Sequence, residues 1–199
     1  QGAYIDPAKF VNKVAVIPQE DVFVPVHTFN DFAVSDDLKR NIAARKYNQP
    51  SAIQDGAIPP ILEGKDLIGL ANTGTGKTAA FVIPIIERLK NIHDKPAVLI
   101  MAPTRELANQ INDEFRAFSR DMRLYTALCV GGMNMYRQIQ DLKRRPQVVI
   151  GTPGRLKDLI QQRALQLDKS SILVLDEADQ MLDMGFIADI RFIVEQMPA

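Results

Sequence analysis

The sequence contains one cysteine, two histidines and no tryptophan. The single cysteine, Cys129, excludes a disulfide within the chain and favours a reducing compartment. It lies in the apolar run LYTALCV without a charged neighbour, which predicts a buried and unreactive thiol. His27 and His93 are expected at the surface, because they do not have the spacing of metal ligands. A fold that is stabilised by disulfides or by structural zinc is therefore not expected.

An excess of one charge and long hydrophobic runs are also absent. Lysine plus arginine and aspartate plus glutamate each number 24, so a nucleic-acid site would depend on local placement of cations. No apolar run approaches the ~18 residues that cross a membrane, and the N-terminal QGAYIDPAKF lacks the basic and apolar regions of a secretory signal. These absences predict a cytoplasmic protein without membrane contact. The first residue is glutamine, which indicates a trimmed or excerpted chain.

Short apolar runs alternate with longer amphipathic segments through most of the chain. The expected strands, apolar enough to be buried on both faces, are 66–70, 97–102, 124–130, 147–151 and 171–175. The expected helices are 35–46, 51–62, 77–90, 105–119, 133–144 and 153–163. This alternation predicts an α/β domain with a parallel sheet flanked by helices on both faces. Residues 1–28 have scattered prolines and no helical period, which predicts an irregular N-terminal extension.

Ligands of such sheets bind beyond the carboxyl ends of the strands, and the segment ANTGTGKT follows the expected strand 66–70. We call residues 71–78 the phosphate loop. Its expected phosphate ligands are Thr73, Gly74, Thr75, Gly76, Lys77 and Thr78. The glycines permit tight turns and close backbone approach, Lys77 can reach the β- and γ-phosphates, and the Thr78 hydroxyl can ligate magnesium. Ala71 stands where the strict motif has glycine, and the structural alternative is a glycine-rich turn capped by Thr73.

Three carboxylates follow the last expected strand, in the stretch SILVLDEAD. Asp176 can hold magnesium, usually through water, and Glu177 can position an attacking water, because adjacent side chains at a strand end point in different directions. A solvated acidic turn is the alternative. The phosphate loop about 100 residues earlier favours the catalytic interpretation.

Five segments in this order resemble the motifs of the DEAD-box family of ATP-dependent RNA helicases. They are Ala71–Thr78, Pro103–Leu107 (PTREL), Gly131-Gly132, Thr152–Arg155 (TPGR) and Asp176–Asp179. The resemblance covers residues 29–199 and implies a RecA-like three-layer domain that binds ATP, Mg²⁺ and RNA.

The resemblance also implies an adenine site. The segment KYNQPSAIQ, residues 46–54, is similar to the family's adenine-reading segment, although Lys46 stands where the family often has glycine. Gln54 would form hydrogen bonds with the edge of adenine, because a side-chain amide offers the donor and the acceptor that adenine needs. Tyr47 would stack on the adenine ring. Phe29 resembles the aromatic residue that buttresses this segment.

The remaining motifs would form an RNA surface. Its expected residues are Pro103, Thr104, Arg105, Gly131, Gly132, Thr152, Pro153, Gly154 and Arg155. The arginines would pair with phosphates, the glycines would admit the RNA backbone, and the threonines would bond phosphate or 2′-hydroxyl oxygens, giving little sequence preference. Taken singly, these residues also suit helix caps and a turn. The basic run 143–145 is expected to be a solvated helix end.

The resemblance further implies a Ser-Ala-Thr segment and a second RecA-like domain, neither of which is in this sequence. We expect a gap in the sheet beside the phosphate loop, negligible ATPase activity and no unwinding by this chain alone. Asp179 would couple the site to the Ser-Ala-Thr segment. The leading hypothesis is the ATP-binding domain of an RNA helicase; an ATP-gated RNA clamp or scaffold and a DNA helicase are the alternatives.

Overall fold

Four short parallel strands form a sheet in the order β2-β3-β1-β4. The computed structural model describes residues 23–72, 74–92 and 96–198. Within them the strands are β1 (Val98–Met101), β2 (Thr126–Cys129), β3 (Val148–Gly151) and β4 (Ile172–Leu175). Val98 pairs with Val148 on one side and Ile172 on the other. Strands β1 and β3 lie inside the sheet and are fully buried, which confirms the expectation for these two runs.

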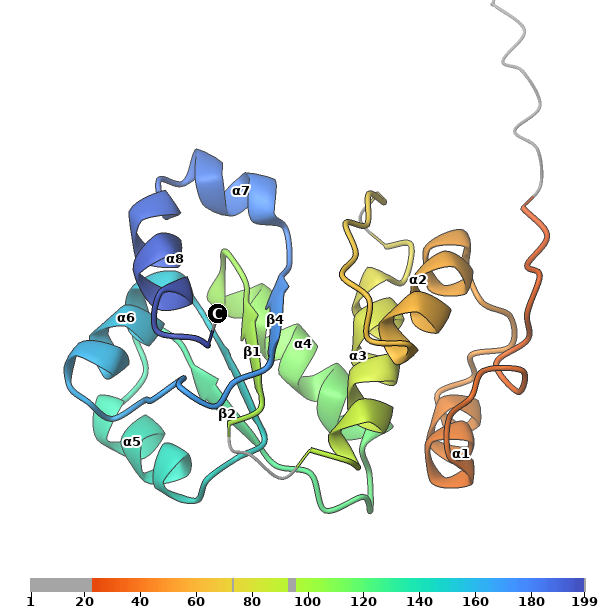
Figure 1. The fold of residues 1–199 in the computed structure, drawn as a ribbon, viewed down its shortest axis with the longest axis horizontal. Helices are drawn as coiled ribbons and strands as arrows, with labels where there is room; N and C mark the ends of the chain where they lie inside the picture. The colour runs from red at the N-terminus through yellow and green to blue at the C-terminus, as the bar shows by residue number, and fades with distance from the viewer. Residues whose placement is uncertain (1–22, 73, 93–95, 199) are drawn as a thin grey trace, which may run out of the picture.

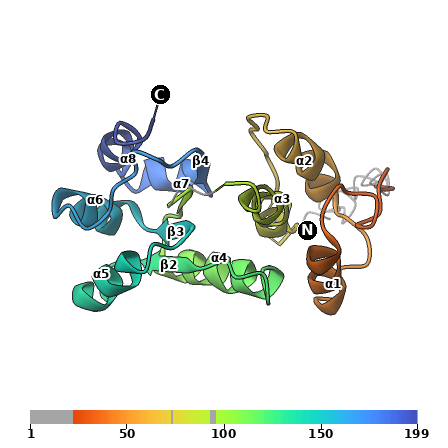
Figure 2. The same cartoon turned by 60° about the horizontal axis from the view of Figure 1, so that its bottom comes forward.

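Helices connect the strands and cover both faces of the sheet. They are α1 (Asp36–Ala44), α2 (Ala52–Leu62), α3 (Lys77–Leu89), α4 (Arg105–Phe118), α5 (Met135–Lys143), α6 (Pro153–Gln161), α7 (Ala178–Asp183) and α8 (Ile187–Val194). The first six confirm the expected helices to within two residues at each end, and α7 and α8 were not expected. Figures 1 and 2 show α4 on one side of the strands and α6 with α8 on the other.

The two layers follow from the alternation of side chains along a strand. Val98 and Ile100 of β1 belong to the core shared with α3 and α4. Leu99 and Met101 belong to the opposite core, which includes residues of α6 and α8. Because both faces of β1 are covered, the expected three-layer α/β arrangement is confirmed.

The expected strand over 66–70 is wrong, because these residues form no strand and expose their apolar side chains. Ile68 is 93% and Leu70 is 92% exposed. A strand needs a hydrogen-bonding neighbour, and none lies beside this segment within the described residues. Strand β4 likewise has only β1 as a described neighbour, and Leu175 is 38% exposed. The prediction that residues 171–175 are buried on both faces was therefore wrong too. The exposure of β4 is consistent with the expected gap in the sheet beside the phosphate loop.

The segment before α1 is anchored to α2 by a buried carboxylate. Asp55 accepts hydrogen bonds from the backbone N–H of Val26 at 2.8 Å and of His27 at 3.2 Å, and lies 2.6 Å from Nδ1 of His27. Burial acts to raise the pKa of Asp55, but these hydrogen bonds together lower it below its usual value. His27 is thus paired rather than a plain surface residue. Residues 23–28 have no helix or strand, whereas 1–22 lie outside the described residues.

A second carboxylate fixes α1 against α3. Glu87 accepts hydrogen bonds at 2.8 Å from both the backbone N–H and the hydroxyl of Ser35, the residue before α1. Burial acts to raise the pKa of Glu87, but these bonds and Lys90 lower it.

No described helix is long and apolar enough to cross a membrane.

Candidate functional site

The phosphate loop leads into α3 as expected, although without a preceding strand. Gly76 is the residue before the helix and has φ +86°. A Cβ at Gly76 would clash with Nε2 of Gln54, and a positive φ disfavours other residues independently. Gly74 also has positive φ. The positive φ and the position of the Gln54 side chain therefore both favour glycine at position 76. Thr73 lies outside the described residues.

The first turn of α2 holds this loop in place. The Ser51 hydroxyl donates to the Thr75 carbonyl at 2.7 Å, and Nε2 of Gln54 donates to the Gly76 carbonyl at 3.1 Å. Oε1 of Gln54 accepts from the Ser51 N–H at 3.0 Å, which closes a capping box at the helix start. Gln54 is only 3% exposed and lies against the phosphate loop. Ser51 was missed, although the S-x-x-Q spacing before α2 is the sequence signal of this box.

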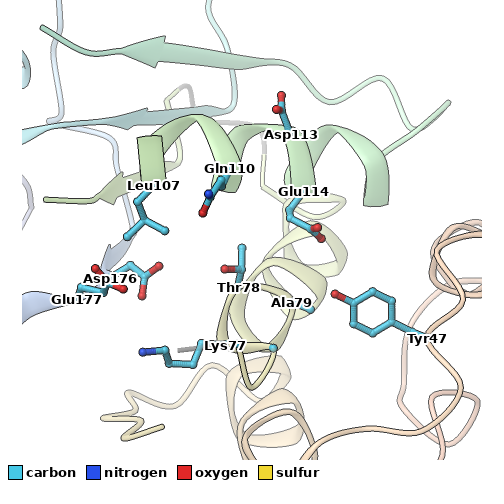
Figure 3. Close-up of a pocket in the computed structure, with 12 residues that line it drawn as sticks. Tyr47, Lys77, Thr78, Ala79, Leu107, Gln110, Asp113, Glu114, Asp176 and Glu177 are labelled. Carbon is cyan, nitrogen blue, oxygen red and sulfur yellow. The ribbon is translucent and has the colours of Figure 1, made fainter. Parts of the chain in front are cut away.

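A pocket of about 450 Å³ extends from the phosphate loop along α4. It is lined by Tyr47, Gly74, Gly76, Lys77, Thr78, Ala79, Leu107, Gln110, Asp113, Glu114, Asp176 and Glu177. Figure 3 shows Lys77 pointing toward the end of the pocket where Asp176 and Glu177 lie, with Tyr47 at the other end. Four of the expected phosphate ligands thus lie with Asp176 and Glu177 in one pocket, from segments about 100 residues apart in the sequence, whereas Thr75 is not among the lining residues.

The two carboxylates differ in their surroundings. Asp176 is 8% exposed, and burial raises its pKa although Lys77 acts to lower it. Glu177 precedes α7 with φ +52°, a left-handed conformation that costs a non-glycine residue ~1–3 kcal/mol and is often found at functional sites. Asp179 is exposed and accepts a hydrogen bond from the Gln180 N–H at 2.9 Å; it is not among the pocket residues.

Thr78 and Asp176 both line the pocket and offer oxygen ligands for magnesium. The described residues contain no group of three or more histidine, cysteine, aspartate or glutamate side chains arranged to hold a metal. Magnesium is usually held by one or two protein ligands together with phosphates and water. A hydroxyl and a buried carboxylate on one pocket fit that pattern.

The ring of Tyr47 lines the far end of the pocket and is packed against two other aromatic rings. Tyr47 packs edge-on against Phe29 with centroids 5.8 Å apart, and against Phe118 at 5.5 Å. Phe29 is 6% exposed and lies behind Tyr47, as a buttress would, rather than in the pocket lining. Burial raises the pKa of Tyr47, and the neighbouring Glu114 acts in the same direction.

The sequence did not predict the α4 side of the pocket. Leu107, Gln110 and Glu114 line it, and their spacing places them on one face of the helix. The helical period was therefore visible, but which face meets the phosphate loop depends on tertiary packing. Glu114 pairs through Oε1 with Arg45, whereas Oε2 is buried without a hydrogen-bond partner among the described residues.

A second surface forms where α4 and α6 begin. Thr104 caps α4 by accepting a hydrogen bond from the Leu107 N–H at 3.2 Å, and Thr152 precedes α6 without a side-chain cap bond. Pro103 and Pro153 are buried at the helix starts, and Gly154 is half-buried in the first turn of α6. The capping alternative is thus confirmed for Thr104.

The turn after β2 joins the motifs of this surface. We call residues 130–133 the glycine loop. Nη1 of Arg105 donates to the Gly131 carbonyl at 3.2 Å, and Nη1 of Arg155 donates to the Met133 carbonyl at 3.2 Å. Gly132 has φ +74°, and a Cβ there would clash with Nη1 of Arg105. PTREL, the glycine pair and TPGR therefore form one contiguous surface.

Two further sequence expectations are confirmed. Cys129 is fully buried, and burial raises the pKa of its thiol to about 12. The basic run 143–145 is exposed at the end of α5, where Arg144 lies 3.5 Å from Asp141. His93 lies outside the described residues.

Comparisons with known proteins agree with this geometry. The family model described as DEAD/DEAH box helicase matches residues 51–199. Proteins named ATP-dependent RNA helicase CshA are 46% identical over 171 residues in Listeria monocytogenes and 45% identical over 170 residues in Limosilactobacillus reuteri. These matches cover 86% and 85% of this chain but only 33% and 34% of the relatives, so the chain spans about a third of their length.

A solved structure is similar in fold as well. A DEAD box protein from the hyperthermophile Methanococcus jannaschii superposes with a TM-score of 0.82 at 37% identity, over 88% of this chain and 48% of that one. The three-layer arrangement of one sheet between two layers of helices is thus of the RecA-like type. With the family model covering most of the sequence, the chain belongs to the DEAD/DEAH box helicase family.

Proposed function

We propose that this chain is the ATP-binding domain of an RNA-dependent ATPase that couples ATP binding and hydrolysis to RNA binding and local duplex unwinding. One observation carries the proposal: Lys77 points toward Asp176 and Glu177 within a single pocket. A cation facing two carboxylates beside a glycine-rich loop suits a metal-bound triphosphate. An acidic turn alone would have no such partner.

Each pocket residue then has a role in phosphoryl transfer. Lys77 would bind the β- and γ-phosphates, supported by backbone from Thr73 to Gly76, and Glu177 would position the attacking water. Thr78 and Asp176 would hold magnesium, which when bound neutralises charge on the phosphates. The burial that raises the pKa of Asp176 disfavours its anion, and a cation bound beside it would offset that cost.

The base would lie toward Tyr47, at the end of the pocket away from the carboxylates. Tyr47 would stack on adenine with Phe29 supporting its ring. Gln54 uses one donor and one acceptor within the protein, and its amide can form one further bond of each kind. Gln54 would therefore read adenine and hold the phosphate loop with the same amide group.

The second surface would bind RNA through its sugar-phosphate backbone. Arg105 and Arg155 each donate one hydrogen bond from Nη1 to a carbonyl of the glycine loop. Other N–H groups of each guanidinium would bind phosphate. The Thr152 hydroxyl makes no cap bond to α6 and would bond phosphate or a 2′-hydroxyl instead. Such contacts predict weak sequence preference. Asp179, exposed in the first turn of α7, would couple this chain to a Ser-Ala-Thr segment.

The relatives' greater length supports a second RecA-like domain as partner of this one. An arginine supplied to the transferring phosphate can be worth about 10³–10⁵ in rate, so we expect this chain alone to be nearly inactive. A cytoplasmic location is part of the same proposal.

Binding and turnover measurements test the proposal. A fluorescent ATP analogue should bind the chain with magnesium dependence, and labelled single-stranded RNA should bind more tightly than DNA of the same sequence. Failure to bind nucleotide would refute the pocket assignment. Equal affinity for RNA and DNA would favour the DNA-helicase alternative, and robust ATP turnover by this chain alone would contradict the need for a second domain.

A further inference from the structure

Three helices hold the glycine loop by its carbonyl groups. Arg105 of α4 and Arg155 of α6 bind the carbonyls of Gly131 and Met133, as described above. The third bond comes from α5, where Nε2 of Gln138 donates to the Val130 carbonyl at 2.9 Å. Three carbonyls in a four-residue turn are therefore held by side chains of three different helices.

This arrangement leaves the backbone donors of the loop available. Within the described residues, the N–H groups of Gly131 and Gly132 have no hydrogen-bond acceptor. Gly132 is exposed and Gly131 is half-buried, so a ligand can approach them. Successive free N–H groups in a turn with left-handed backbone form a concavity that suits an anion.

Gln138 differs from the two arginines in one respect. It is 3% exposed, so it cannot contact a nucleic acid bound at the surface. Its Oε1 is buried without a hydrogen-bond partner, as is Nε of Arg155, and together they are two of the three such side-chain atoms in the described residues. An unpaired buried acceptor is unfavourable, and an apolar side chain of similar size would avoid it. The hydrogen bond to the Val130 carbonyl favours glutamine for stability, but the unpaired Oε1 offsets part of that gain, so stability accounts for only part of the preference for glutamine here.

We propose that Gln138 is a positioning residue for the RNA-binding surface. By holding the Val130 carbonyl, it fixes the glycine loop so that the N–H groups of Gly131 and Gly132 receive a phosphate of the RNA backbone. This inference rests on the proposed RNA-binding function and adds a buried residue that none of the surface motifs includes.

The competing explanation is that Gln138 simply ties α5 to the end of β2. The chain offers a matched control at the opposite end of the same strands. Gln147 is 8% exposed, and its Oε1 accepts a hydrogen bond from the Tyr125 N–H at 3.0 Å. Each glutamine makes one side-chain bond to the backbone, but only Gln138 adjoins the glycine loop. A purely structural role predicts equivalent effects of replacing either.

The experiment compares Gln138→Met with Gln147→Met in the 199-residue chain. Both variants should melt at lower temperature than the wild type, because each loses one buried hydrogen bond. Fluorescence anisotropy with labelled single-stranded oligouridylate should show RNA binding roughly three- to tenfold weaker for Gln138→Met only. The affinity for a fluorescent ATP analogue should remain unchanged in both.

Wild-type RNA affinity in Gln138→Met, or equal weakening in Gln147→Met, would overturn the positioning role while leaving the proposed function intact. No RNA binding by the wild type would instead remove the proposed function and this inference together. If a methionine variant does not fold, Gln138→Leu and Gln147→Leu replace the pair. As a second measurement, the backbone amide resonances of Gly131 and Gly132 should shift with RNA in the wild type and shift much less in the folded Gln138 variant; equal shifts would overturn the inference.

Discussion

The side chain of Gln54 and the backbone of Gly76 are joined directly, through the hydrogen bond from Nε2 to the Gly76 carbonyl. Gly76 has no room for a Cβ because that same amide occupies the space. The start of α2 and the phosphate loop therefore form one unit, and whatever binds the loop is linked mechanically to Gln54.

A double-mutant cycle tests this unit. Gly76→Ala should weaken nucleotide binding strongly, because it combines the clash with Gln54 and a φ of +86°. Gln54→Ala should weaken it through loss of the loop anchor. In the double variant the clash is gone, so the combined loss should be smaller than the sum of the single losses by ~0.5–3 kcal/mol. Additive losses in titrations with a fluorescent ATP analogue would contradict a shared unit.

Lys77 and Glu177 should separate binding from chemistry. Lys77→Ala should weaken ATP-analogue binding, because it removes the cation proposed to bind the β- and γ-phosphates. Glu177→Gln keeps the shape and should leave binding nearly unchanged, but in a protein that also carries the second RecA-like domain it should stop hydrolysis. A Glu177→Gln variant that turns over ATP at the wild-type rate would remove Glu177 from its proposed role.

Arg105 should contribute to RNA binding and not to nucleotide binding. Arg105→Ala removes the cation proposed to bind an RNA phosphate and the bond to the Gly131 carbonyl. The slope of log affinity against log salt should fall by ~0.7 for one lost contact with a single strand. Arg116→Ala, an exposed position further along the same helix, is the control. Equal loss of RNA and ATP affinity in Arg105→Ala would contradict two separate surfaces.

Asp55 should make the stability depend on acid pH. Its folded-state pKa is lowered from the usual 3.8, so the unfolded chain binds the proton more readily and stability rises with pH in this range. The contribution is fully present above the unfolded pKa and is lost as pH falls through the folded one. Asp55→Asn should therefore flatten this part of a stability–pH curve measured by urea unfolding, whereas the exposed control Asp183→Asn should not.

Cys129 should behave as a buried thiol. With its pKa raised to about 12 and no exposed surface, it carries little thiolate near neutral pH. Ellman's reagent at pH 8 should react with the folded chain only slowly and with the unfolded chain in denaturant at once. Rapid reaction of the folded chain would show that the β2 edge opens readily.

Local patterns predicted much of the fold and of the site. The alternation of apolar runs with amphipathic segments predicted the six helices from α1 to α6. The rule that ligands bind at strand ends predicted that Arg105, Gly131 and Arg155 share one surface. The failures are non-local. Residues 66–70 have the composition of a strand but no described neighbour to pair with, and the composition of a segment does not supply its partner.

The residues that were missed share the same cause. Ser51, Glu114 and Gln138 matter because of what lies opposite them in space: the Thr75 carbonyl, the pocket and the Val130 carbonyl. Helical spacing gave the face of each helix without showing which neighbour it meets. Such contacts become visible only when the elements are packed together.

In the part of the chain that the structure describes, one side of β4 has no neighbouring strand, and this affects how the molecule behaves in concentrated solution. An open strand edge presents unsatisfied backbone groups that can pair with another chain, and the nearly fully exposed side chains of Ile68 and Leu70 add apolar surface. Together they favour self-association as concentration rises. Aggregation at this edge, rather than weakness of the β1–β3 core, is then expected to limit how concentrated a solution of the chain can be.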